Sequence, residues 1–371
     1  MDKFIPVNEP SLGEREKELL IECIDTGWIS SEGPFVEKFE NSFSKKVNRK
    51  YGISCSSGTA ALDLAVASLK IGPGDEVIMP TFTIISCASA VIRRGAKPVL
   101  IDADPKTWNM NVQEIESSIT SRTVAIMAVH IYGLPVDMSP ILEIANKYKL
   151  FVIEDAAELI GAKYKNNPCG SFGHLSTFSF YPNKHITTGE GGMVVTNDMQ
   201  ISNRCKSLRN LCFQKNKRFI HEELGWNYRM TNLQAALGIA QLEKLDSIVK
   251  TKINNGKIYN KFLEGIKGLE IPLKKTSYAE NIYWVYGVLI NSDITTAEEI
   301  VVKLKDSNIG TRPFFYPMHQ QPVFKEMGIF DNKPFPISEN LYKNGFYLPS
   351  GLNLKFESIK KVSEILKNLI Q

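Results

Sequence analysis

The segment FSFYPNKHITTGEGGMVVT, residues 178–196, joins an apolar strand pattern to a second one through a lysine and a glycine-rich turn. Its glycines allow the backbone to turn sharply and to approach a ligand closely. Lys184 lies where the first strand pattern ends, and its amine can form an imine with the carbonyl of a cofactor. A lysine beside glycines is more often a solvated turn residue, so this interpretation depends on the rest of the chain.

Apolar strand patterns and helix patterns alternate along the first half of the chain. Strand patterns cover 76–80, 98–101, 123–129 and 150–153, and helix patterns such as 140–147 separate them. Strands rich in Val, Ile and Leu between helices predict a mainly parallel sheet that is covered on both faces. The expected fold class is therefore α/β, with ligands bound beyond the carboxyl ends of the strands.

The composition changes after a long helix pattern at 232–248. Residues 249–371 hold more lysine, asparagine and aromatic residues, with a strand pattern at 284–290 and a helix pattern at 296–306. These patterns predict a smaller α+β domain. For a chain of 371 residues we expect a large domain at 1–248 and a small C-terminal domain at 249–371, packed together.

The overall composition argues against several classes of protein. The net charge is only +4, from 44 basic and 40 acidic residues that are scattered, so neither nucleic acid nor a membrane surface is an expected partner. No apolar run reaches the ~18 residues that span a bilayer, and the first residues lack a signal peptide pattern, so we expect a cytoplasmic protein. The six cysteines and five histidines show no metal-binding spacing, so no metal is expected.

Two acidic residues follow the strand pattern at 150–153. Asp155 would lie at the carboxyl end of that strand, where it could pair with a protonated pyridine nitrogen and keep the ring an electron sink. Glu158 could reach the phenolic side of the same ring or the amino substrate. Capping of the following helix is about as plausible a role for Asp155.

Ser57, Gly58 and Thr59 open a helix pattern. Backbone N–H groups at a helix N-terminus, with hydroxyls beside them, can hold a phosphate, and Ser179 could add another hydroxyl. An ordinary serine or threonine N-cap is the commoner meaning of such a sequence. The order along the chain, however, is phosphate cradle, ring-nitrogen acid and imine lysine, which is typical of fold-type I pyridoxal-phosphate enzymes.

Longer runs resemble one family. They are TFSFYPNKHITTGEGGMVVTND, VIEDAAE, SSGTAAL, GWNYRMTNLQAALGIAQL and RPFFYPMHQQPVF, and they are similar to the DegT-type nucleotide-sugar aminotransferases, in particular the GDP-perosamine synthase branch. The resemblance covers nearly the whole chain and implies a fold-type I, aspartate aminotransferase-like large domain. It implies that Lys184 binds pyridoxal 5'-phosphate (PLP), which alternates with its pyridoxamine form (PMP), and that Asp155 and Glu158 contact the ring. It also implies phosphate contacts from Gly58, Thr59 and Ser179.

The resemblance further implies a homodimer with shared active sites, because Asn227 would reach the cofactor phosphate of the neighbouring subunit. The implied reaction converts a nucleotide-linked 4-keto-6-deoxy sugar to the 4-amino sugar with L-glutamate as donor, for surface polysaccharide (O-antigen) biosynthesis. Arg229 and Arg312 are candidates for binding the diphosphate. The candidate substrate contacts also include Trp28, Tyr316 and His319, although aromatic packing is an equal alternative for the last two.

The chain departs from the family pattern in two places. Ile84 stands where family members often carry an aromatic residue that stacks on PLP, and residues 208–213 lack the usual glycine turn.

Three alternative functions remain open. A PLP-dependent sugar dehydratase would use the same pocket, but some of these enzymes have histidine in place of the imine lysine, whereas here His185 only neighbours Lys184. An aminotransferase acting on another keto sugar is the second alternative. A non-catalytic PLP-binding regulator is the third, and it would be expected to lose Lys184 or Asp155.

Overall fold

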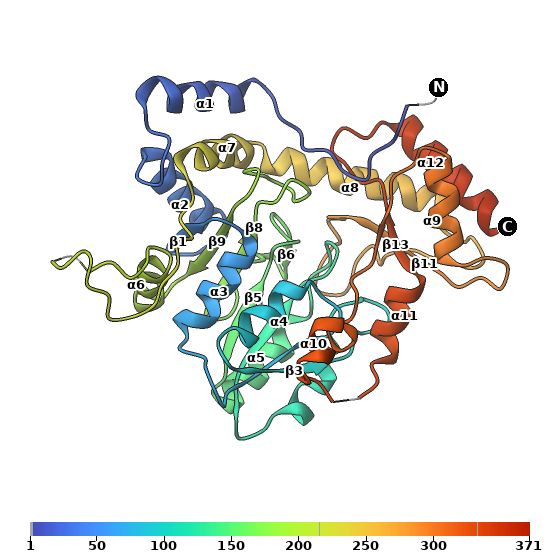
Figure 1. Cartoon of the computed structure of the whole chain (residues 1–371). Coiled ribbons are helices and arrows are strands. Elements are labelled where there is room, and N and C mark those ends of the chain that lie inside the picture. The colour runs from blue at the N-terminus through green and yellow to red at the C-terminus, as the bar shows by residue number, and fades with distance from the viewer. Residues whose placement is uncertain (1–2, 215, 332) are drawn as a thin grey trace.

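A computed structural model describes residues 3–214, 216–331 and 333–371, with a seven-stranded sheet at its centre (Figure 1). The strand order is β1-β9-β8-β5-β4-β2-β3. Neighbouring strands are parallel from β8 to β3, and only β9 runs antiparallel to its neighbours β8 and β1. The predicted α/β class and mainly parallel sheet are confirmed. The strands are β1 (Tyr51–Cys55), β2 (Glu76–Pro80), β3 (Lys97–Ile101), β4 (Thr123–Val129), β5 (Phe151–Asp155), β8 (Leu175–Ser179) and β9 (Gly192–Thr196).

Helices cover both faces of this sheet. One face packs against α3 (Gly58–Ser68), α4 (Ile85–Ile92) and α6 (Met199–Leu208), and the other against α2 (Pro34–Lys46), α5 (Met138–Tyr148) and α7 (Asn232–Glu243). Successive side chains of a strand point to opposite faces. In β9, Val194 therefore packs on the first face, while Met193 and Val195 pack on the second. Burial on both faces explains the nearly continuous apolar runs in β2, β4 and β9.

The C-terminal part of the chain forms a second sheet with its own core. Its four strands, in the order β10-β11-β13-β12, are all antiparallel, and α9 (Ala297–Asp306) and α12 (Phe356–Ile370) pack on them (Figure 1). The helix predicted at 296–306 begins at a capping box, in which Thr296 and Glu299 satisfy each other's backbone N–H groups. The strands are β10 (Leu269–Glu270), β11 (Tyr286–Ile290), β12 (Arg312–Pro313) and β13 (Gly345–Leu348).

The helix predicted at 232–248 is two helices. The first, α7, ends at Glu243, and α8 (Leu245–Leu263) begins after Lys244, whose φ and ψ are −101° and 0°. Apolar residues continue across the junction at Leu242 and Leu245, so the pattern does not reveal one non-helical residue. The helix α8 then passes residue 248 without a break and leads from the large sheet to the C-terminal sheet (Figure 1).

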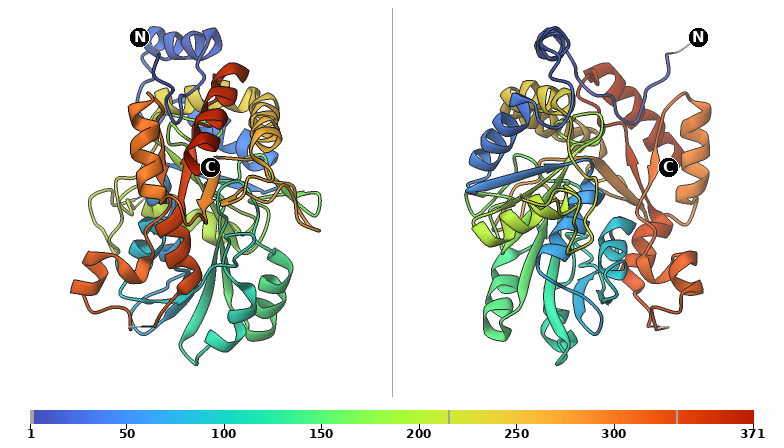
Figure 2. Two further views of the ribbon diagram at one scale, coloured as in Figure 1. Left: turned by 90° about the vertical axis from the view of Figure 1, so that its right-hand side faces the viewer. Right: turned by 60° about the vertical axis from the view of Figure 1, so that its left-hand side comes forward.

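The first described residues pack on the C-terminal part of the chain. Ile5 forms a bridge with Ile309, and the carbonyl of Val7 accepts a hydrogen bond from the N–H of Ser350. The next helix, α1 (Glu14–Thr26), lies at the top of both views in Figure 2. None of the helices in the described ranges is both long enough and apolar enough to cross a bilayer. The remaining elements are β6 (Lys163–Tyr164), β7 (Asn167–Pro168), α10 (Pro322–Glu326), α11 (Pro336–Asn344) and the 3-10 helices Val112–Glu114, Glu116–Ser118 and Met318–Gln320.

Lys252 of α8 joins the elements around the C-terminal sheet. Its side chain is 1% exposed, and its amine donates hydrogen bonds to the carbonyl oxygens of Trp284 and Ser350. Burial lowers the pKa of Lys252 to about 7. The folded chain therefore favours the neutral amine at a pH where the unfolded chain binds the proton.

This difference predicts a pH-dependent stability. The unfolded amine titrates near ~10.4, so the free energy of unfolding should rise between about pH 7 and about pH 10, by at most ~1.4 kcal/mol per pH unit. Lys252→Met removes this titration, so urea unfolding should show the wild type gaining stability over the variant as the pH rises. Lys257→Met, at an exposed position of the same helix, is the matched control. A difference between wild type and Lys252→Met that stays constant with pH would contradict the prediction.

Candidate active site

A cavity of about 470 Å³ opens at the carboxyl ends of the central strands, where the sequence predicts the ligand. It is lined by side chains from β5, β8, α3, α4 and the C-terminal sheet. It contains every predicted cofactor contact except Asn227. These lining residues are Ser57, Gly58, Thr59, Ile84, Asp155, Glu158, Ser179 and Lys184.

Lys184 lies in a turn after β8, and its amine faces the cavity. The Nζ atom is 3.7 Å from Oε1 of Glu158 and 3.7 Å from the centroid of the Trp284 ring. Burial lowers the pKa of Lys184, while the negative charges of Glu158 and Asp155 oppose this effect. A buried lysine of this kind reaches its neutral, nucleophilic form more easily than an exposed one.

Asp155 is the last residue of β5, and its carboxylate is held from two sides. Oδ1 accepts a hydrogen bond from the N–H of Ala157 at 3.1 Å, and Oδ2 accepts one from the thiol of Cys87 at 3.3 Å. Burial raises the pKa of Asp155, and these two hydrogen bonds and the charge of Lys184 oppose the rise. A protonated ring nitrogen against this carboxylate would stabilise its charged form. The residue therefore fits the role predicted for it.

Glu158 follows the same strand and is oriented by the backbone. Its Oε2 accepts a hydrogen bond from the N–H of Tyr132 at 2.8 Å, while Oε1 faces Lys184. Burial raises the pKa of Glu158, and the charge of Lys184 opposes the rise. Glu158 and Lys184 thus form a buried pair of proton-binding groups that is largely shielded from water.

The N-terminus of α3 forms a cradle of hydroxyl groups. Ser57 is the N-cap and accepts a hydrogen bond from the N–H of Ala60 at 3.1 Å, so its capping role is realised, and its phosphate-binding role stays a prediction. Gly58 is required by close approach, because a Cβ there would lie 2.6 Å from the Cβ of Ser179. Thr59 lies beside it and shares a hydrogen bond with Ser86 at 2.9 Å. Hydroxyls and the free N–H groups of a helix start suit a phosphate monoester.

The other predicted site residues do not line this cavity. Both ring nitrogens of His319 are engaged, with the hydroxyl of Thr81 at 2.9 Å and the carboxylate of Glu339 at 3.0 Å. Tyr316 packs edge-on against the ring of Tyr342. These residues lie outside the cavity of the single chain, so their roles in substrate binding stay predictions. The full set is Trp28, Asn227, Arg229, Arg312, Tyr316 and His319.

Three aromatic residues of the C-terminal part line the cavity and have no counterpart among the predicted contacts. They are Trp284, Phe315 and Tyr347. Burial raises the pKa of Tyr347 to about 12, so its phenol stays protonated. This region of the sequence is rich in aromatic residues, and Phe315 lies in the run RPFFYPMHQQPVF, but nothing in the sequence places any of the three beside Lys184. The thiol of Cys87, which binds Asp155, also lacks a sequence signal.

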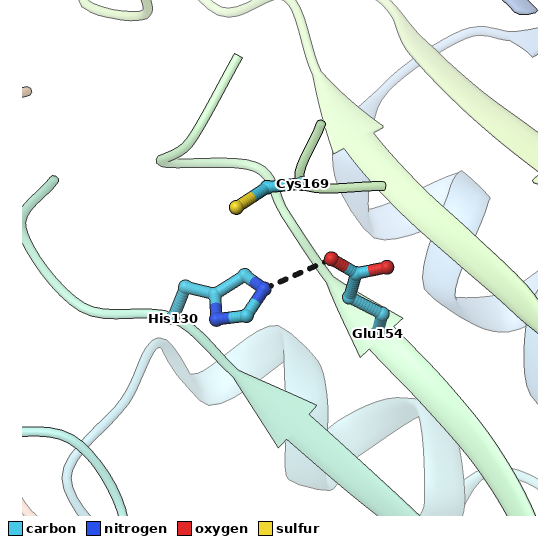
Figure 3. A group of neighbouring side chains, drawn as sticks. All are labelled: His130, Glu154 and Cys169. Atoms are coloured by element: carbon cyan, nitrogen blue, oxygen red, sulfur yellow. Dashed lines mark hydrogen bonds and ion pairs between the residues drawn. The ribbon is translucent and has the colours of Figure 1, made fainter. Parts of the chain in front are cut away.

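A buried cluster of possible metal ligands adjoins the cavity through His130, which also lines it (Figure 3). The ligand atoms of His130, Glu154 and Cys169 are within 4.8 Å of one another. Nδ1 of His130 accepts a hydrogen bond from the N–H of Val136, so Nε2–H donates to Glu154 at 3.0 Å. Both nitrogens of His130 and both carboxylate oxygens of Glu154 are engaged, so hydrogen bonds account for the placement of these two residues. The other donors to Glu154 are the N–H groups of Gly170 and Phe172 and the hydroxyl of Ser176.

Adding a Cβ at Gly58 tests whether the hydroxyl cradle binds the cofactor phosphate. Gly58→Ala should displace Ser179 and weaken PLP binding by tenfold or more, since a displaced phosphate ligand forfeits about 1.5 kcal/mol or more. Absorbance titration of the cofactor-free protein with PLP would measure this. Gly189→Ala is the control, because its φ of +79° strains the backbone but a Cβ there meets nothing within 4 Å. Equal losses of affinity in both variants would show that the cradle is not specifically involved.

Comparison with known proteins agrees with this geometry. Residues 10–367 match the DegT/DnrJ/EryC1/StrS aminotransferase family. The GDP-perosamine synthase of Escherichia coli O157:H7 is 44% identical over 98% of this chain and 97% of its own length, and that of Vibrio cholerae is 37% identical over 98% and 99%. The X-ray structure of S. venezuelae DesV in complex with a ketimine intermediate is 28% identical, with a TM-score of 0.93 over 100% of this chain and 99% of that one. The fold-type I architecture is thereby confirmed, and the chain belongs to the DegT/DnrJ/EryC1/StrS aminotransferase family.

Proposed function

We propose that this PLP-dependent aminotransferase converts a GDP-linked 4-keto-6-deoxy sugar to its 4-amino derivative, with L-glutamate as amino donor. The observation that carries the proposal is the buried amine of Lys184, which faces Glu158 and Asp155 beside the hydroxyl cradle. The choice of sugar rests on the GDP-perosamine synthases that match nearly the whole chain. A product of this kind would serve surface polysaccharide synthesis.

The described residues divide the work at the cavity. PLP, when bound, supplies a ring that accepts electrons from the bond broken at the reacting carbon. Ser57, Gly58, Thr59 and Ser179 would hold its phosphate, and Asp155 its ring nitrogen. Glu158 would face the phenolic oxygen, and its negative charge stabilises the ammonium form of the lysine.

Lys184 has two tasks in this proposal. Its Nζ, which faces the cavity, would hold the cofactor. As a free amine it would act as general base and acid, moving the proton at the α-carbon of glutamate. Trp284, Phe315 and Tyr347 form an aromatic wall that limits the access of water to this proton transfer.

The test combines a spectrum with a product analysis. Purified protein with PLP should show a visible absorbance band that shifts to shorter wavelength on addition of L-glutamate. Lys184→Ala should alter the band and lower turnover by ~10²-fold or more, the range expected for loss of a general base. Lys257→Ala, at an exposed position, is the control.

The acceptor is tested with GDP- and dTDP-linked 4-keto-6-deoxy sugars. Mass spectrometry of the product distinguishes amination from the loss of water that a sugar dehydratase would cause. Amination of the GDP sugar is the expected outcome. Loss of water would favour the dehydratase, and amination of the dTDP sugar alone would favour an aminotransferase for another nucleotide sugar. A normal PLP spectrum without turnover of either sugar would favour a non-catalytic PLP-binding regulator.

We further propose that the active form is a homodimer with shared sites. Asn227 is exposed outside the cavity of its own chain, where its Oδ1 accepts a hydrogen bond from Arg229. Large apolar side chains are exposed on and just after α1, a feature typical of an interface. A second subunit could cover them and receive Asn227 and Arg229 at its own cavity. These apolar residues are Ile21, Ile24, Trp28 and Ile29.

Mixing two inactive variants tests the shared site. Lys184→Ala and Arg229→Ala protomers should each be poorly active alone. After exchange of subunits, a hybrid dimer contains one intact site, so the mixture should recover roughly a quarter of wild-type activity. Light scattering checks the dimer, and native mass spectrometry confirms the exchange. A mixture that exchanges subunits and gains no activity would show that each site is built by one chain.

The cytoplasmic location expected from the sequence belongs to the same proposal. All six cysteines are free thiols and buried. Free thiols are usual where the compartment is reducing, and disulfides are rare there. This state of the cysteines supports the location.

A further inference from the structure

We propose that Trp284 positions the amine of Lys184 over the cavity whenever that amine is not bonded to the cofactor. This inference rests on the proposed function, in which Lys184 alternates between a bonded and a free amine. No family motif quoted from the sequence includes Trp284, which lies two residues before β11 in the C-terminal part of the chain.

The face of the Trp284 ring meets the amine directly. Nζ of Lys184 lies 3.7 Å from the ring centroid, the same distance that separates it from Oε1 of Glu158. Tryptophan is the best aromatic partner of a cation, and the attraction is stronger where water is excluded. Trp284 is 3% exposed, so this contact is of the shielded kind. The ring therefore favours the ammonium form of Lys184.

The ring and the backbone of Trp284 are each held by a hydrogen bond. The Nε1–H of the ring donates a hydrogen bond of 2.7 Å to the carbonyl of Asn183, the residue just before Lys184. The carbonyl of Trp284 in turn accepts a hydrogen bond of 3.0 Å from Lys252 of α8. The indole is thus tied to the segment that carries the lysine and to the helix that connects the two sheets.

The backbone before Trp284 is pressed against the loop that follows β4. The N–H of Ile282 donates to the carbonyl of Gly133 at 2.9 Å, and a Cβ on Gly133 would lie 2.5 Å from the backbone nitrogen of Trp284. Gly133 has a φ of +100°, so glycine is required there on two grounds. This fit leaves little freedom for the position of the ring.

Packing alone does not account for the arrangement. Trp284 does contact the ring of Tyr132, with centroids 6.1 Å apart, as part of an aromatic cluster. A purely packing residue, however, gains nothing from presenting its face to an amine at the edge of a cavity. The charged and titratable groups around that amine are Glu158, Asp155 and Cys87, together with the buried neighbour His185. With Glu158, Trp284 provides a place in which the ammonium formed by proton transfer is retained.

The test measures the amine itself, in protein without cofactor. Trace reductive methylation with formaldehyde and cyanoborohydride modifies only neutral amines, and peptide mass spectrometry reports Lys184 separately from exposed lysines such as Lys257. The midpoint of labelling against pH gives the pKa of Lys184, and the plateau at high pH gives its accessibility. In Trp284→Leu the midpoint should fall by about one pH unit. In Trp284→Phe, which keeps a ring face, it should fall by less.

Two further measurements serve as controls for the effect of the substitution at Trp284. Glu158→Gln should also lower the midpoint, which shows that the assay responds to a lost partner. Replacement of all tryptophans by 5-fluoro- and 5,7-difluorotryptophan weakens the ring face without changing its shape, and should lower the midpoint in steps. The same replacement in Trp284→Phe should have no effect on it. This arm needs no destabilised variant.

A midpoint that stays at the wild-type value in Trp284→Leu and in the fluorinated protein, while Glu158→Gln shifts it, would overturn the proposal. Because the assay contains neither PLP nor sugar, its outcome is independent of the turnover assay. Failure of amino transfer alone would overturn the proposed function. Failure of the midpoint to move would overturn only the positioning role of Trp284.

Discussion

The site depends on one physical constraint, which is that the primary amine of Lys184 is buried away from water. Burial favours the neutral form of Lys184, and Glu158, Asp155 and the face of Trp284 favour the charged form. The carboxylates can approach the amine because β5 and β8 are adjacent and parallel, with Asp155 opposite Thr177. Their carboxyl ends therefore deliver an acid and a lysine to the same edge of the sheet. The strand order is in this sense a requirement of the site.

Much of this edge could be predicted from the sequence, because its signals are local. Two strands can be recognised from about ten residues of sequence each, one ending in Asp155 and one leading to Lys184. Because ligands bind beyond the carboxyl ends of parallel strands, both residues are then expected at the same site. The hydroxyl cradle is equally local, since Ser57 and Gly58 begin a helix. Contacts across the fold have no such signal. Trp284 reaches Lys184 only through the fit of its loop against Gly133, and periodicity says nothing of that fit.

Because sequence signals are local, they also miss the partners of His319 and the junction between α7 and α8. The partners of His319 come from Thr81 and Glu339, two segments far apart in sequence, so only the folded chain shows that both ring nitrogens are engaged. The break at Lys244 is one residue wide, whereas helix periodicity is read over a window of many residues. Sequence patterns thus predict elements well and the joints between them poorly.

Alternation along β5 separates two neighbouring carboxylates into different roles. Ile153 and Asp155 point to the face covered by α3 and α4, where Cys87 meets Asp155, while Glu154 points to the opposite face. There, four donors saturate Glu154, among them His130 (Figure 3). A carboxylate bound in this way fixes the ends of β4 and β5 and has no lone pair free for a ligand. Asp155, one residue later, keeps its place at the cavity.

The groups that would hold the cofactor and the group that holds the free amine come from different parts of the chain. The hydroxyl cradle, Asp155 and Glu158 belong to the large sheet and its helices, whereas Trp284 belongs to the C-terminal part. Lys252 on α8 donates to Trp284 and to Ser350, so the position of the ring follows the position of the C-terminal sheet. A shift of that sheet would change the surroundings of the Lys184 amine and leave the cradle in place. Such a shift would reach the lysine amine through the face of the Trp284 ring.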